Sequence, residues 1–459
     1  MLSLYDSVTK SKKDFVPIDQ DHIKLYVCGP TVYATPHIGN ARPAVVFDVL
    51  SRLLRGLYPK VTYVRNITDV DDKIQQAAAK EDTTIEVITK RYTECYHHDI
   101  QTLGCLPPDI EPRATDNIAT MIELISKLIA RKHAYVSQDH VLFSVNTYAD
   151  HGLLSGRIKA NNRAGARVAV ADYKQDPEDF ILWKPSLAHE PGWASPWGRG
   201  RPGWHIECTA MIIKHLGMPI DIHGGGGDLL FPHHENEQAQ GCCLGMGKVY
   251  SRYWMHNGMI AVDKEKMSKS LGNIILVKDL LAAFPGEAIR LALLQTHYRQ
   301  PIAWKDELLI DAKNCLDKYY RIRQDNEKYF NAVTQTSWQD IPAAIQQALL
   351  DDMNTPLAIR HWQDLVRSLA KPATDKAAVA KAIIATNLAL GFGYNDVADW
   401  FQNVQGKLSA EQIDAMLEER EQARLAKDFA KADAIRDELN ENNIHIEDYK
   451  GKTTWRYNS

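Results

Sequence analysis

The chain has 459 residues, enough for about three domains of ordinary size. Its formal net charge is −4, from 54 basic and 58 acidic residues, so a nucleic-acid partner would have to be met by local patches rather than by an overall positive charge. The seven cysteines are odd in number and widely spread, which excludes a disulfide framework and indicates a reducing compartment.

The sequence also lacks the signals of export and membrane insertion. The first residues show no charged stretch followed by an apolar segment, and no apolar run approaches the ~20 residues of a membrane helix. We therefore expect a cytoplasmic protein without a membrane partner.

Strands and helices alternate in the first hundred residues. An apolar run at 23–28 reads as a buried strand, residues 44–55 have helical periodicity, and 61–67 form a second strand. Thr68 is a good N-cap, and the acids at 69–72 suit the first turn of the next helix. This order predicts an α/β fold with a parallel, doubly wound sheet.

The pattern changes near residue 107. Residues 108–203 have the features of a small insertion, with a helix near 116–132, a β-rich stretch at 140–145 and a loop rich in Pro, Gly and Trp at 192–203. We expect this insertion to split the α/β domain.

The α/β pattern resumes after the insertion. A helix is expected over 206–216, and a strand over 219–223 runs into four glycines at 224–227, which are typical of a ligand-cradling loop or a flexible turn. Another helix begins near His233, and the period is helical from about 287 onward. Residues 400–406 read as a link to a final small unit.

Two distant motifs point to phosphate chemistry. His37-Ile38-Gly39-Asn40 follows the first strand, where a helix N-terminus offers unpaired N–H groups and a positive dipole end. Gly39 allows close approach of the backbone, and His37 can donate to phosphate oxygens. Asn40 can donate one hydrogen bond but carries no charge.

The second motif, Lys266-Met267-Ser268-Lys269-Ser270, lies in a late loop. Lys266 and Lys269 supply mobile cations that can stabilise charge building on pyrophosphate, and Ser268 can donate a hydrogen bond. Alone, this motif is more typical of a solvated loop. Together, the two motifs predict a clamp for the phosphates of ATP.

Four residues are candidates for a metal site. His233 and Glu237 lie four residues apart and project from one helix face, whereas His234 has Gln238 at that spacing. Cys28 and Cys208 can add two thiolates, and such a ligand set suits Zn²⁺. The alternatives stay open: a lone buried cysteine is usually a small hydrophobe, and His234 could contact the nucleotide or lie behind the site.

These motifs together resemble class I aminoacyl-tRNA synthetases, and further segments narrow the resemblance to the bacterial-type cysteine enzymes. It covers nearly the whole chain and is carried by 203–208, 223–237, 266–270 and 351–356. The resemblance implies that the zinc ligands, one ion per chain, are Cys28, Cys208, His233 and Glu237.

The resemblance also assigns the substrate contacts. It places Gly29, Thr68 and Trp204 around the amino acid and Lys269 on ATP, although from sequence alone Trp204 would be core and Thr68 a cap. Asp228 could hold the substrate ammonium or a ribose hydroxyl, or be an ordinary turn residue. Asn40 replaces the family's usual second histidine. The catalytic candidates are therefore His37, Asn40, Lys266 and Lys269.

The implied function is ATP-dependent ligation of L-cysteine to its cognate tRNA through a cysteinyl-adenylate, with ATP entering as its Mg²⁺ complex. A bound Zn²⁺ with an open position would favour a thiolate over the hydroxyl of serine, which a plain pocket rejects by only ~10²-fold. The rivals are a cysteine ligase acting on an amino-sugar and a non-catalytic RNA-binding relative. The long tail argues against the first, and the intact motifs argue against the second.

The implied architecture is a Rossmann-like catalytic domain split by a small insertion, then a helical bundle and a small C-terminal module, in a chain that we expect to be monomeric. The expected segments are catalytic halves at 1–107 and 204–265, the insertion at 108–203, a mobile signature loop and stem-contact region at 266–310, a tRNA-binding bundle at 311–400 and an anticodon module at 401–459. In that module, cations and aromatics alternate at the end, where Trp455 either stacks on anticodon bases or packs on its own domain.

Overall fold

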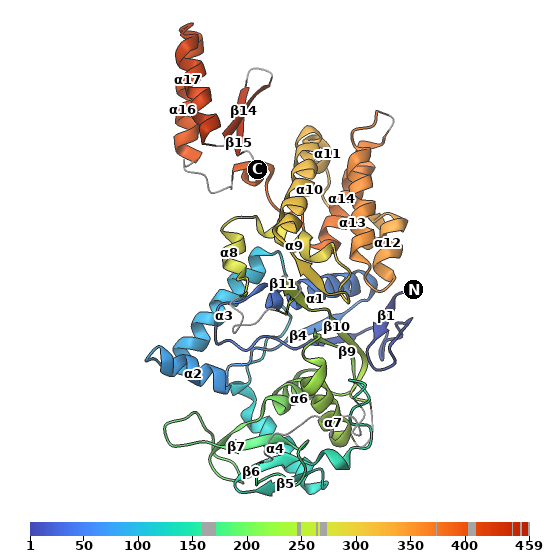
Figure 1. The fold of residues 1–459 in the computed structure, drawn as a ribbon. Helices are drawn as coiled ribbons and strands as arrows, with labels where there is room; N and C mark the ends of the chain where they lie inside the picture. Colours follow the sequence, from blue (N-terminus) through green and yellow to red (C-terminus); the bar gives the residue numbers. More distant parts are fainter. Residues whose placement is uncertain are drawn as a thin grey trace.

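The computed structural model describes residues 1–157, 171–245, 249–262, 265–266, 273–372, 374–402, 410–442, 444–449 and 452–457. The central sheet lies in the middle of the molecule, with the insertion at one end and the helical bundle and C-terminal module at the other (Figure 1). Within the described ranges, no helix is both long and apolar enough to cross a membrane.

The central sheet has four parallel strands in the order β10-β9-β3-β4. These strands are β3 (Ile23–Val27), β4 (Val61–Arg65), β9 (Ile220–Gly226) and β10 (Ser251–Asn257). The chain leaves β3 for β4 on one side and returns much later as β9 on the other side, which makes the carboxyl ends of β3 and β9 a switch point where ligands bind in such sheets. The parallel sheet confirms the predicted α/β class.

Helix α1 (Ile38–Leu57) packs on this sheet and begins six residues before the predicted helix. The prediction started after Pro43, but proline is tolerated near a helix start, and Pro43 lies inside α1. Its first turn is closed by a capping box in which the backbone N–H of His37 donates to Oδ1 of Asn40 at 3.1 Å. The phosphate motif is therefore the N-terminus of α1 itself.

The predicted cap at Thr68 is wrong. Helix α2 (Asp72–Lys80) begins three residues later, and its N-cap is Asp71, whose carboxylate accepts from the backbone N–H of Lys73. Thr68 instead continues from β4, with its backbone bridged to Thr31. Helix α3 (Ile85–Thr102) then returns along the sheet.

The glycine run is a strand rather than a loop over most of its length. Gly224, Gly225 and Gly226 belong to β9, and only Gly227 follows it. A Cβ on Gly224 would lie 2.3 Å from the Phe47 ring of α1, so glycine here allows helix and strand to approach each other. Sequence composition alone favours a turn because it does not show this long-range packing.

The insertion has its own antiparallel sheet, in the order β5-β6-β7-β8, and an apolar core that it shares with residues from 206–244. Residues 200–202, predicted as loop, form its last strand. The elements here are α4 (Ile118–Ala130), β5 (Ala134–Ser137), β6 (His140–Phe143), β7 (Phe180–Pro185) and β8 (Gly200–Pro202). The chain then re-enters the α/β region through α6 (Trp204–His215) and, after β9, α7 (Glu235–Leu244).

A second small sheet, in the order β12-β11-β13, joins the α/β region to the bundle. Its strands are β11 (Ile260–Val262), β12 (Glu265–Lys266) and β13 (Ile302–Trp304), with α8 (Val277–Leu281) and α9 (Gly286–Leu294) between β12 and β13. The bundle comprises α10 (Asp306–Asp325), α11 (Glu327–Asn331), α12 (Ala343–Leu350), α13 (Thr355–Ser368), α14 (Lys376–Leu390) and α15 (Val397–Gln402). The expected link at 400–406 is therefore helical up to Gln402, and the rest lies outside the described residues.

The C-terminal module pairs α16 (Ala410–Leu425) and α17 (Phe429–Glu441) with a hairpin of β14 (Ile444–Tyr449) and β15 (Lys452–Tyr457). Trp455 is buried in the core of this module, and its indole N–H donates to Asp414 at 2.8 Å. Of the two alternatives for Trp455, the structure supports packing on its own domain.

Candidate active site

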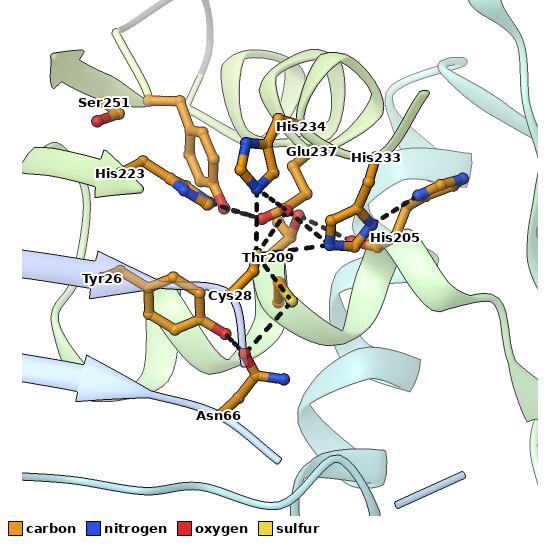
Figure 2. A network of polar contacts seen from close by, with 12 residues as sticks. Tyr26, Cys28, Asn66, His205, Thr209, His223, His233, His234, Glu237 and Ser251 are labelled. Atoms are coloured by element: carbon orange, nitrogen blue, oxygen red, sulfur yellow. Dashed lines mark hydrogen bonds and ion pairs between the residues drawn. The ribbon is translucent and has the colours of Figure 1, made fainter. Parts of the chain in front are cut away.

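Four predicted metal ligands converge at the carboxyl edge of the central sheet. Figure 2 shows three of them, Cys28, His233 and Glu237, directed toward one another. Sγ of Cys28 lies 3.7 Å from Sγ of Cys208, 3.6 Å from Nε2 of His233 and 3.4 Å from Oε1 of Glu237. His233 and Glu237 approach each other to 2.9 Å. All four side chains are buried.

These separations fit a small tetrahedral ion. Arms of 2.0–2.3 Å, as in zinc sites, give edges of about 3.3–3.8 Å between ligand atoms. The three distances from the Cys28 sulfur fall within that range, and the 2.9 Å contact between His233 and Glu237 is shorter, as expected where a hydrogen bond joins them. Two thiolates, an imidazole and a carboxylate are a donor set that suits Zn²⁺.

Different elements deliver these ligands. Cys28 follows β3 directly, and Cys208 lies on the second turn of α6. His233 belongs to a wide helical turn over Leu230–His234, and Glu237 lies in the first turn of α7. The helix predicted to open near His233 thus begins at Glu235, yet the i, i+4 relation still brings both ligands to one side.

Glu237 is held as a carboxylate. Burial favours its protonation, but the nearby imidazoles of His223 and His233 outweigh burial and lower the pKa of Glu237 well below its usual value. Its second oxygen, Oε2, accepts from His223 at 3.0 Å and from the Tyr250 hydroxyl at 3.2 Å. These contacts leave Oε1 directed at Cys28 and His233.

His205 orients His233. Its Nδ1 lies 3.0 Å from Nδ1 of His233, which leaves Nε2 of His233 facing the two sulfurs. Burial and the neighbouring His233 lower the pKa of His205 to about 3, so His205 is neutral. Outer hydrogen bonds of this kind fix the orientation of metal-binding histidines.

His234 is a fifth group at the cluster. Its Nε2 lies 3.3 Å from Sγ of Cys28, and its Nδ1 lies 2.7 Å from Nε2 of His256, which in turn reaches the Ser7 hydroxyl at 2.8 Å. It therefore contacts the cluster directly, rather than standing only behind it.

A cavity of about 300 Å³ opens from this cluster toward the start of α1. Cys28, Trp204 and Asp228 line its inner end, and His37 and Asn40 line the end at the helix N-terminus. The candidate metal ligands and the phosphate motif thus face the same space. Its other polar lining residues are Thr31, Tyr33, Arg42, Arg65, Lys73, Tyr96 and Asn257.

Trp204 is not a core residue. It is 37% exposed, and its ring stacks on His233 with centroids 4.1 Å apart and planes 15° apart. The indole therefore forms a wall over the cluster. A simple apolarity argument misses this because the residue begins α6 at the cavity rather than beneath it.

Gly29 is required by a close backbone approach. Its N–H donates to Oδ1 of Asn66 at 2.9 Å, and a Cβ at this position would lie 1.7 Å from the Asn66 carbonyl oxygen. Asn66 also accepts from the Tyr26 hydroxyl and donates to the Thr68 hydroxyl. Thr68 is buried one layer behind the cavity, where it supports Asn66 and through it Gly29.

The lysine motif is only partly described. Lys266 ends β12, which pairs with β11 beside the cavity, whereas Ser268 and Lys269 lie outside the described residues. The chain beyond the motif returns to α1, because the Ile38 N–H donates to the Ile275 carbonyl at 2.9 Å. The described segments on either side of the motif therefore flank the start of α1.

Sequence reasoning missed the residues that support the ligands. No motif marks His205, His223, Tyr250 or Asn66, and their partners lie up to 142 residues away in the chain. The only available signal was the clustering of histidines around the glycine run and the Cys208 segment.

Comparison with known proteins decides the family. Residues 14–314 match the family model of the class I (C) tRNA synthetase catalytic domain, and residues 408–456 match that of the cysteinyl-tRNA ligase anticodon binding domain. The chain belongs to the cysteine–tRNA ligase family of class I aminoacyl-tRNA synthetases. It is 51% identical to the cysteine–tRNA ligase of Rhodospirillum rubrum over 99% of both chains, and 51% identical to that of Parvibaculum lavamentivorans over 99% of this chain and 97% of the relative.

A solved synthetase shares the fold. The Mycobacterium tuberculosis methionyl-tRNA synthetase in complex with methionyl-adenylate superposes with a TM-score of 0.56 at 16% identity, covering 81% of this chain and 90% of that chain. The predicted synthetase class is thus confirmed, and the chain is an enzyme of the cysteine–tRNA ligase family.

Proposed function

We propose that this chain joins L-cysteine to its cognate tRNA in two steps. The cysteine carboxylate attacks the α-phosphate of Mg²⁺-bound ATP and releases pyrophosphate, and the cysteinyl group of the adenylate then passes to the terminal ribose of the tRNA, at the 2′-hydroxyl. The observation that carries this proposal is the single cavity between the ligand cluster and the N-terminus of α1.

The inner end of the cavity selects the amino acid. Cys28, His233 and Glu237, together with Cys208 beside Cys28, would hold one Zn²⁺, which when bound prefers a thiolate to a hydroxyl group. Trp204 closes this end against water, and we assign Asp228 to the substrate ammonium.

The outer end positions ATP. His37 and the positive dipole end of α1 would meet the phosphates, with Gly39 allowing the close approach. Asn40 would stabilise this end of α1, because the oxygen of its side-chain amide accepts from the His37 N–H and so caps the helix. Lys266, Ser268 and Lys269 would meet the departing pyrophosphate, so that positioning and charge stabilisation supply the rate without a covalent nucleophile.

The rest of the chain would present the tRNA. We assign the helical bundle to tRNA contact and the C-terminal module to the anticodon, in a protein acting as a cytoplasmic monomer. The match of residues 408–456 to an anticodon-binding family supports this over ligation of cysteine to an amino-sugar, which has no use for such a module.

Product analysis tests the proposal. The purified chain, supplied with ATP, cysteine and cysteine tRNA, should release AMP and pyrophosphate and leave an ester-linked cysteine on the tRNA. The same reaction with an amino-sugar in place of tRNA should give no amide. If cysteine is transferred to the amino-sugar and not to tRNA, the assignment is wrong.

A further inference from the structure

Arg42 lies on α1, two residues beyond Asn40, and is completely buried. Its Nη1 donates to the carbonyls of Gly258 at 2.6 Å and Met259 at 3.0 Å. Its Nη2 donates to the carbonyls of Gln300 at 2.6 Å, Tyr298 at 3.3 Å and His297 at 3.4 Å. Its recorded partners in the described structure are thus five backbone carbonyls.

Burial of a cation on carbonyl dipoles alone is costly for stability. Removal from water lowers the pKa of Arg42 to about 10, so the guanidinium remains charged at neutral pH. An apolar side chain of similar length would fill the same space without that cost. The arrangement therefore points to a geometric task.

The five carbonyls lie in two segments that lead directly into strands. Gly258 and Met259 join β10 to β11, and residues 297–300 lead into β13. Strand β11 pairs with β13 on one edge and with β12, which ends at Lys266, on the other. Arg42 thus fastens the base of the hairpin that leads to the lysine motif.

The far end of the same segment is fastened to α1 as well. The Ile38 N–H donates to the Ile275 carbonyl at 2.9 Å, and the Val277 N–H donates to the Pro36 carbonyl at 3.0 Å. The chain that carries the lysine motif therefore leaves and returns at fixed points beside the phosphate-binding end of α1. Through its hydrogen bonds, Arg42 fixes the position of the backbone just before β11, where this segment begins.

We propose that Arg42 is a positioning residue for adenylate formation, which holds the lysine-bearing hairpin at the distance from His37 that the triphosphate requires. This inference rests on the proposed function, because it assumes that Lys266 and Lys269 meet the pyrophosphate. Displacements of about 1 Å in such an arrangement can slow a reaction about 10²-fold. Arg42 lines the cavity but is completely buried, so it acts through the backbone carbonyls that it holds.

Arg42→Met, Arg42→Lys and the control Arg52→Met test the proposal. Arg52 is also on α1 and also donates to backbone carbonyls, those of Leu388 and Gly104, but it faces the bundle. Single-turnover adenylate formation should be about 10²-fold slower in Arg42→Met, partly restored in Arg42→Lys, and unchanged in Arg52→Met. Zinc content should be unchanged in all three.

A binding measurement separates positioning from general damage. A non-hydrolysable cysteinyl-adenylate analogue lacks the β- and γ-phosphates, so its affinity should be unchanged in Arg42→Met. An equal loss of analogue affinity and rate, or an equal slowing in Arg52→Met, would overturn the inference. If Arg42→Met does not fold, Arg42→Lys decides, and a wild-type rate in that variant overturns it too.

Lys269→Ala distinguishes this inference from the function on which it rests. If Lys269→Ala forms adenylate at the wild-type rate, the phosphate clamp itself is wrong. If Lys269→Ala is slow while both Arg42 variants are normal, the clamp stands and only the role of Arg42 fails.

Discussion

At the scale of single residues, the candidate metal ligands contact one another and so fix one another's positions. Sγ of Cys28 contacts Cys208, His233 and Glu237, so it stands at the centre of the set. Its pKa is raised well above the usual value by burial and then by the neighbouring Cys208. In the protein without metal this thiol remains protonated, and an ion would have to displace that proton.

Cys208→Ser should lower zinc occupancy from about one ion per chain and cysteine activation together, because a hydroxyl is a poor ligand for this ion. Zinc would be measured by elemental analysis and activation by ATP–pyrophosphate exchange. Cys95→Ser is the matched control, since Cys95 lies half-buried on α3 outside the cluster. Full activity in a variant without zinc would contradict the role of the cluster.

The sequence was sufficient to predict that Cys28, Cys208, His233 and Glu237 lie together, but not what surrounds them. His233 and Glu237 could be paired by helical spacing, and Cys28 by its place after an apolar strand. Trp204, Thr68 and the glycine run were misread from local pattern because their environments are made by segments far away in the chain. Arg42 was not singled out at all, since its nearest carbonyl partners lie 216 residues on.

At the scale of elements, helix α3 contains a buried carboxylate, Asp99, that lowers stability when it is ionised. Asp99 is 3% exposed, and its Oδ2 has no hydrogen-bond partner in the described structure. Burial raises its pKa to about 6, from a usual value of 3.8. The folded chain therefore binds a proton at Asp99 more tightly than the unfolded chain, and ionised Asp99 lowers stability above pH 6.

Asp99→Asn should raise the free energy of unfolding at pH 8 by on the order of 1–2 kcal/mol. The gain should shrink as the pH falls through 6 and vanish near pH 4, where Asp99 is protonated in both states. Urea unfolding at pH 4, 6 and 8 measures it, with Glu94→Gln on the exposed face of α3 as the control. An equal gain at all three pH values would contradict a titrating penalty.

The order of elements was largely predictable, and their ends were not. Alternating strands and helices gave the parallel sheet because buried strands and amphipathic helices have distinct periods. The start of α1 was predicted too late because Pro43 was taken to precede the helix. The start of α2 was predicted too early because Thr68 and Asp71 are both suitable N-caps, and only tertiary contacts decide between them. The C-terminal hairpin went unpredicted, since its strands are short and polar.

At the scale of the whole molecule, the cavity and the C-terminal module are separate. The cavity is lined by residues from 27 to 260, and none of the described residues of the module contributes to it. The boundary follows α15, where the Trp400 indole is tied to Asp317 of α10 at 2.8 Å. A chain ending at Gln402 keeps that contact and the whole bundle.

Truncation after Gln402 should leave cysteine-dependent ATP–pyrophosphate exchange mostly intact and sharply reduce the charging of tRNA. The loss should appear mainly as a higher KM for tRNA, because the contacts removed are binding contacts. A tRNA with an altered anticodon should cause the same loss of charging by the full-length chain, and it should cause little further loss with the truncated chain. Unchanged charging by the truncated chain would remove the anticodon assignment.

The most direct test of the account is the preference for cysteine over serine with and without zinc. The measurement is kcat/KM for each amino acid in ATP–pyrophosphate exchange, in zinc-loaded and chelator-treated protein. With zinc, cysteine should exceed serine by far more than the ~10²-fold of a plain pocket, and without zinc the preference should fall to that range or below. A preference that is equally large in both preparations would show that the cluster of Cys28, Cys208, His233 and Glu237 does not recognise the thiol.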